Sequence, residues 1–123
     1  MNLEEFMNKI DMHVYIELGE ENPFRDHPEP YHYAWTITIG SGSISGHASG
    51  TMTTPPPRAI LYCVIHDIKT IMGQRPEYLS ASFPYLKPEL AQEAIDIVTS
   101  RVRFFKRHLT YDELEQLERL VMG

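Results

Sequence analysis

The chain has a single cysteine, Cys63, and no apolar run that approaches the ~20 residues needed to cross a bilayer. One cysteine cannot form an intramolecular disulfide, so a disulfide-stapled secreted fold is excluded. The start of the chain carries no recognisable secretory signal, and we expect a cytoplasmic protein with no membrane partner. Lys and Arg are also scarce, at 11 against 17 Asp and Glu, which gives a net charge of −6. This balance disfavours direct binding to nucleic acid, which calls for excess positive charge.

The 123 residues suffice for one hydrophobic core, and we expect residues 1–123 to form a single domain. The apolar fraction of 42% is ordinary for a globular protein, so no metal or disulfide is required to hold the fold together.

Changes in hydrophobic period predict the elements. Period-two alternation predicts strands over 12–18 and 31–39, and Gly46 and Gly50 fit a bulge or bend in a weaker third strand. Thr110 and Glu113 form a capping box at the start of the last helix. We therefore predict an α+β fold in the order α-β-β-β-α-α-α, with a three-stranded antiparallel sheet, an N-terminal helix, a central buried helix and two C-terminal helices. The helices are expected over 3–10, 55–72, 88–109 and from 110 onward, with one further helical turn within 76–84.

Two details of the helices bear on function. In the central helix, Tyr62 and Cys63 widen the apolar face, which predicts that both pack in the core. In the helix over 88–109, Phe105 belongs to the apolar stripe, whereas Phe104 lies off it and is expected to be exposed.

The first five elements match the topology of the double-stranded-RNA-binding domain. Such domains present lysines at the start of the helix that follows the sheet. Here residues 53–58 read Thr-Thr-Pro-Pro-Pro-Arg, so that chemistry is missing, and topology alone carries little functional weight. We do not expect binding to double-stranded RNA.

Three groups of residues resemble parts of known chemical sites. The Gly-Ser tract over 40–46 lacks the Lys-Ser/Thr ending of a P-loop and is interpreted as a hairpin turn. Cys63 and His66 share a helical face with Asp67 next to them, yet a mid-helix cysteine lacks the surroundings that activate a thiol. His13, His32 and His47 could meet on the sheet, although their spacing does not demand it. We predict no catalytic residue, no metal site, no cofactor and no enzymatic activity.

The acidic residues are unevenly distributed. Residues 1–30 hold eight of them against two basic residues, and residues 31–66 hold none. An acidic segment beside a strand can offer carboxylates to a basic cleft, in imitation of nucleic-acid phosphates. An ordinary solvated loop is the alternative interpretation. The candidate partner-binding residues are Glu17, Glu20, Glu21, Asp26 and Glu29.

The main basic run lies at the end of the helix over 88–109. With an exposed aromatic residue, such a run could contact nucleic acid, although cations also favour the C-terminal end of a helix dipole. The candidate residues of this alternative, a nucleic-acid-binding regulator, are Arg101, Arg103, Lys106 and Arg107.

One resemblance is carried by five stretches: Trp35–Ile39, the small-residue turn that follows, Ser49–Thr53, Pro55-Pro56 leading into Ala59–Leu61, and Asp67. This pattern resembles small proteins of bacteriophages and prophages. The resemblance implies an inhibitor of a host system, anti-CRISPR proteins included, that occludes a nucleic-acid channel or locks an effector. The expected partner is a host protein or ribonucleoprotein complex with a basic cleft. A structural phage protein that forms a homo-oligomer is a further alternative.

Overall fold

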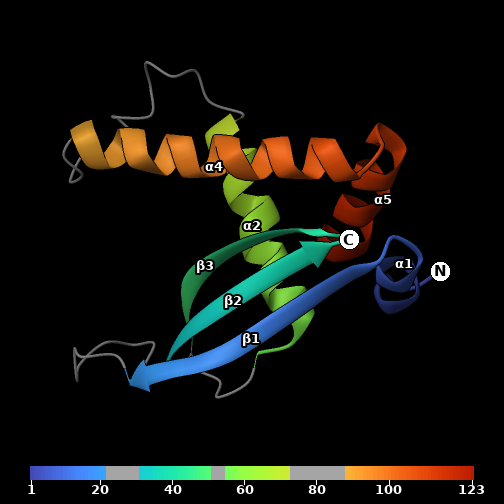
Figure 1. Cartoon of the computed structure of the whole chain (residues 1–123), viewed down its shortest axis with the longest axis horizontal. Helices are drawn as coiled ribbons and strands as arrows, with labels where there is room; N and C mark the ends of the chain where they lie inside the picture. The colour runs from blue at the N-terminus through green and yellow to red at the C-terminus, as the bar shows by residue number, and fades with distance from the viewer. Residues whose placement is uncertain (22–30, 51–54, 73–87) are drawn as a thin grey trace.

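A computed structural model describes residues 1–21, 31–50, 55–72 and 88–123, with only the backbone at 19–21, 49, 70–72 and 88–91. The element order α-β-β-β-α-α-α confirms the predicted α+β fold and its three-stranded antiparallel sheet (Figure 1). The helical turn expected within 76–84 lies outside the described residues. The elements are α1 (Leu3–Lys9), β1 (Met12–Glu21), β2 (Tyr31–Ile39), β3 (Gly42–Gly50), α2 (Pro57–Met72), α4 (Pro88–His108) and α5 (Tyr111–Met122).

The sheet has β2 at its centre, with β1 and β3 antiparallel on either side. Gly40 and Ser41 join β2 to β3, and the flanking residues Ile39 and Gly42 pair directly. The φ of Gly40 is +58°, as required at the first central position of a type II′ turn. A two-residue connection of this kind fixes the register of the hairpin, and with it the residues that face the core.

The glycines of β3 do not form a bulge. Each residue of β3 pairs in unbroken register with β2, so the predicted bulge at Gly46 or Gly50 is wrong. The irregular pairing lies in β1 instead, between Leu18 and Glu21.

What the glycines of β3 provide is room for α4. A Cβ atom at Gly46 would lie 2.5 Å from Cζ2 of Trp35 and 2.8 Å from Nη2 of Arg101. A Cβ atom at Gly42 would collide with the ring of His108. Side chains of α4 therefore rest directly on the backbone of β3, in the close approach that strand glycines permit.

One face of the sheet, here called the inner face, packs against the helices. In Figure 1, α2 passes behind the strands and α4 crosses above them. The opposite face, here called the outer face, is half-buried or exposed wherever its side chains are described. Alternation along each strand therefore separates one buried layer from one open layer. The buried side chains include Met12 of β1, Tyr33, Trp35, Ile37 and Ile39 of β2, Ile60, Leu61, Val64 and Ile65 of α2, and Phe105, Leu109, Leu117 and Val121 near the C-terminus.

Two predictions about burial in the helices are wrong. Tyr62 and Cys63 are exposed. The buried stripe of α2 contains Ile60 and Leu61 and the residues one turn further along, and Tyr62 and Cys63 lie outside it. Phe104 is only 9% exposed. The ring of Phe104 fits between α4 and β3 because the strand residue beside it, Gly42, has no side chain. Its centroid lies 4.8 Å from that of the His108 ring.

The first and last helices lie together. α1 contacts α5, and the two ends of the chain emerge on the same side of the molecule (Figure 1). Arg58, near the start of α2, donates from Nε and Nη2 to the carbonyl oxygen of Val121 at 3.3 and 3.2 Å. This cation satisfies a carbonyl in the last turn of α5, which no intrahelical donor reaches.

None of the helices in the described ranges combines the length and the apolar character that a membrane span needs.

Candidate functional site

The predicted partner-binding carboxylates are only partly placed. Glu17 is exposed and pairs across the sheet with Ala34, so it lies on the outer face. Glu20 and Glu21 are the last residues of β1, where the backbone alone is described. Asp26 and Glu29 lie outside the described residues. The structure thus fixes where this acidic segment leaves the sheet, and its function as a docking surface stays a prediction.

The outer face is rich in small polar side chains. The register places His13, Thr38 and Ser43 in one row and Tyr15, Thr36 and Ser45 in the next. The outer-face side chains of β1, β2 and β3 that the structure describes include no lysine or arginine. Hydroxyl groups and aromatic rings on an open sheet provide hydrogen-bonding and stacking contacts without positive charge. The third row consists of Glu17, Ala34 and His47.

The histidines of the sheet do not converge. The rings of His32 and His47 stack with centroids 5.3 Å apart. His13 lies two rows away, where its Nε2 is 3.1 Å from Oδ1 of Asp11. Over the described ranges, no three side chains of His, Cys, Asp or Glu are grouped closely enough to hold a metal ion.

The basic run of α4 is divided between two environments. Arg101 turns toward the sheet, with its guanidinium carbon 4.9 Å from the centroid of the Trp35 ring. Desolvation lowers the pKa of the Arg101 guanidinium, and the carboxylate of Asp67 offsets that shift in part. Arg101 therefore stabilises the contact between α4 and the sheet through a cation–π interaction. Its guanidinium group is partly buried against the sheet, so only part of it is accessible to a nucleic acid.

Arg103 and Arg107 are exposed on the other side of α4. Together with Ser43 of β3 and Ser100 of α4, they line a groove of about 300 Å³. Lys106 is exposed but does not line this groove. Two guanidinium groups and two hydroxyl groups around one hollow are donors suited to a phosphate. The sequence alone could not show that Ser43 and Ser100 join the arginines, since they come from different elements.

The thiol group is exposed on α2. Cys63 and His66 are both on the surface, and the His66 ring stacks on Tyr62 with centroids 6.0 Å apart. The helix places these side chains on its solvent side, away from the core.

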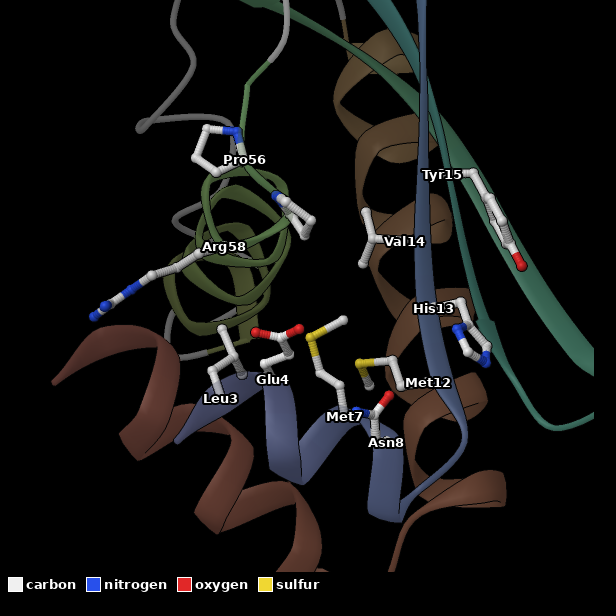
Figure 2. Close-up of a pocket in the computed structure, with 11 residues that line it drawn as sticks. Leu3, Glu4, Met7, Asn8, Met12, His13, Val14, Tyr15, Pro56 and Arg58 are labelled. Carbon is white, nitrogen blue, oxygen red and sulfur yellow. The ribbon is translucent and has the colours of Figure 1, made fainter. Parts of the chain in front are cut away.

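A larger groove lies between α1, β1 and the start of α2. Its volume is about 530 Å³, and Figure 2 shows Val14, Met7 and Met12 at its walls with the carboxylate of Glu4 directed into it. Met7 and Val14 belong to apolar faces of α1 and β1, and the hydrophobic pattern does not show that these side chains are only partly covered. The sequence therefore did not indicate this groove.

Comparisons with protein-family models, with curated proteins and with solved structures find no match.

Proposed function

We propose that this protein acts by binding another protein, through the outer face of the sheet and the acidic segment that continues from β1. The single observation that supports it is the open outer face, whose described side chains include Glu17 and no cation. An open surface of Ser, Thr, His and Tyr side chains can form a polar contact area. Carboxylates at its border favour association with a cationic partner and raise the rate of encounter.

The resemblance to small phage proteins suggests the kind of partner. We propose a host defence nuclease or surveillance complex whose basic cleft normally holds nucleic acid. In this proposal the carboxylates pair with the Lys or Arg side chains that otherwise hold phosphates, so inhibition follows from occupation of the cleft. The residues assigned to this role are Glu17, Glu20, Glu21, Asp26 and Glu29.

The experiment is phage plaquing on bacteria that carry a CRISPR–Cas nuclease, with and without expression of this chain. We expect the chain to restore plaquing and to co-purify with a nuclease subunit. Changing the five acidic residues to Gln or Asn should abolish both effects while the thermal unfolding temperature stays nearly constant. Restoration by the five-residue variant would show that the acidic segment is not the site. Failure of the unchanged chain against every nuclease tested would contradict the function itself.

A matched pair of single variants isolates position from net charge. Glu17→Lys changes the charge on the outer face, and Glu115→Lys makes the same change at an exposed position of α5. The proposal requires that Glu17→Lys weakens inhibition and that Glu115→Lys does not. Equal effects would indicate a general dependence on net charge rather than a docking surface.

The groove beside α4 favours one alternative, a nucleic-acid-binding regulator. Arg103 and Arg107 would hold backbone phosphates with help from Ser43 and Ser100, and binding would weaken steeply with salt. Fluorescence anisotropy with a labelled DNA duplex at 50 and 200 mM salt (about a fourfold range in which such contacts respond strongly) tests this. Changing both arginines to Gln should reduce the salt slope by about 2, and Lys9→Gln on α1 is the matched control. No binding at low salt would eliminate this alternative.

A further inference from the structure

The strand β1 has a free edge whose backbone groups can be assigned residue by residue. The backbone N–H of Gly40 donates to the carbonyl oxygen of Asp11 at 3.0 Å. Because hydrogen-bonded and non-hydrogen-bonded residues alternate in an antiparallel pair, His13, Tyr15 and Glu17 also direct their backbone groups to β2. Met12, Val14, Ile16 and Leu18 consequently direct theirs away from the sheet. No strand in the described part of the chain pairs with this edge.

Over its first seven residues, this edge lacks the sequence features that usually block pairing with another strand. Edge strands of monomeric proteins are commonly blocked by proline, lysine or a bulge. From Met12 to Leu18 the sequence contains no proline or lysine, and the irregular register begins only after Leu18. Tyr15 and Leu18 are 58% and 48% exposed, which leaves apolar surface beside the unpaired backbone. Such an edge is a template for another strand.

The larger groove runs alongside this edge. In Figure 2, the side chains of His13 and Tyr15 point away from the groove, whereas that of Val14 faces it. Met7 and Met12 supply flexible, polarizable walls that adapt to different apolar side chains. The groove thus offers an apolar hollow on the inner side of the edge.

Charge along the groove and the edge is negative. The carboxylate of Glu4 points into the groove, and Asp11 and Glu17 are exposed on either side of the free-edge segment. The nearest cation of the lining, Arg58, directs its guanidinium group toward α5, where it binds the Val121 carbonyl. Asp11 is 3.1 Å from Nε2 of His13, and Arg58 keeps its charge, so a docking segment meets a net negative charge that comes chiefly from Glu4 and Glu17.

We propose that the free edge of β1 and the adjoining groove bind an extended, basic segment of a partner protein, which adds to the sheet as a fourth, antiparallel strand. Side chains of the added strand alternate between the two faces. Apolar side chains enter the groove beside Met7 and Val14, and lysines or arginines lie on the outer side near Glu17. This inference shares Glu17 with the proposed function but otherwise concerns the edge backbone and the groove rather than the segment after β1.

The experiment uses the complete chain and a synthetic seven-residue peptide, acetyl-Lys-Val-Lys-Val-Lys-Val-Lys-amide. In antiparallel addition, the valines lie opposite Val14 and Ile16 and share their hydrogen bonds, whereas the lysine N–H groups point away. N-methylation of the valines should therefore weaken binding at least about tenfold, since two or three backbone hydrogen bonds are lost. N-methylation of the lysines should leave affinity within about threefold. Equal affinities of the two methylated peptides, or no binding of the parent peptide, would overturn the proposal.

Amide hydrogen exchange provides an internal control. In the free protein, the amides of Val14 and Ile16 should exchange rapidly and those of His13 and Tyr15 slowly, because only the latter are bonded to β2. Peptide binding should protect Val14 and Ile16 selectively. If these two amides are already protected in the free chain, for instance through pairing of two copies at this edge, the proposal is wrong.

A charge variant tests the basic character of the partner. Glu17→Lys should weaken binding of the peptide several-fold, because Glu17 lies on the outer side with the added lysines, and Glu5→Lys, at an exposed position of α1 outside the groove lining, should change it less. Equal effects of the two substitutions would show that the Glu17 carboxylate does not select the ligand.

Discussion

Replacing Gly46 of β3 by alanine tests how closely α4 crosses the sheet. The added Cβ atom would lie 2.5 Å from Cζ2 of Trp35 and 2.8 Å from Nη2 of Arg101, both shorter than any normal carbon contact. Arg101 can move, because its side chain is long and only half-buried. The Trp35 ring is 4% exposed and held on the inner face, so it must be displaced together with its neighbours.

The expected loss of stability follows from two opposing effects. Overpacking a filled core costs about 1–3 kcal/mol. Alanine in place of glycine returns about 0.4–1 kcal/mol, because the unfolded chain loses freedom. The free energy of unfolding should therefore fall by about 1–2 kcal/mol. For a chain of this size the melting temperature should drop by roughly 3–10 °C.

Urea and thermal unfolding followed by circular dichroism measure this change. Ser45→Ala, at an exposed position of the same strand, is the control and should stay within about 0.5 kcal/mol. Trp35→Phe removes the atoms that collide, so the double variant of Gly46→Ala and Trp35→Phe should be more stable than the sum of the single changes by at least about 0.5 kcal/mol. Unchanged stability of Gly46→Ala, or strict additivity in the cycle, would refute this account of the contact between α4 and β3.

Three further predictions concern buried and capping groups. The Tyr33 hydroxyl is buried and has no hydrogen-bond partner among the described residues, so Tyr33→Phe should raise the free energy of unfolding by about 1 kcal/mol, and a loss in urea titration would contradict this. Burial, with a smaller effect of Tyr31, raises the pKa of Tyr33, so the hydroxyl group keeps its proton to higher pH in the folded state than in the unfolded state. The free energy of unfolding should therefore decline as pH rises above about 10 in the wild type, and less steeply in Tyr33→Phe. Thr110→Ala removes the acceptor for the Glu113 N–H at 3.2 Å and one half of the capping box, which should cost about 1 kcal/mol in thermal unfolding, whereas Thr110→Ser should cost little.

Much of the fold could be predicted from local signals. Alternation identified β2 to the residue, since its nine positions carry a strict apolar pattern and the strand is buried on one face. The capping box at Thr110 and Glu113 located the start of α5, because both hydrogen bonds are formed within four residues of sequence. Such signals need no knowledge of distant contacts.

Contacts between elements could not be predicted in the same way. The burial of Phe104 depends on a glycine in β3, and the exposure of Cys63 depends on which stripe of α2 faces the sheet. Gly46 was interpreted as a local irregularity, although its effect is on a helix more than fifty residues away. For the candidate sites, the sequence identified Arg103 and Arg107 but could not add Ser43, which reaches the same groove only through tertiary packing.

Because α1 packs against α5, the two ends of the chain lie on the same side of the molecule. A short linker between Gly123 and Met1 would therefore allow circular permutants, with new ends opened in the exposed Gly40–Ser41 turn. In such a permutant the helix that walls the groove would be tethered on both sides, while the acidic end of β1 stays untouched.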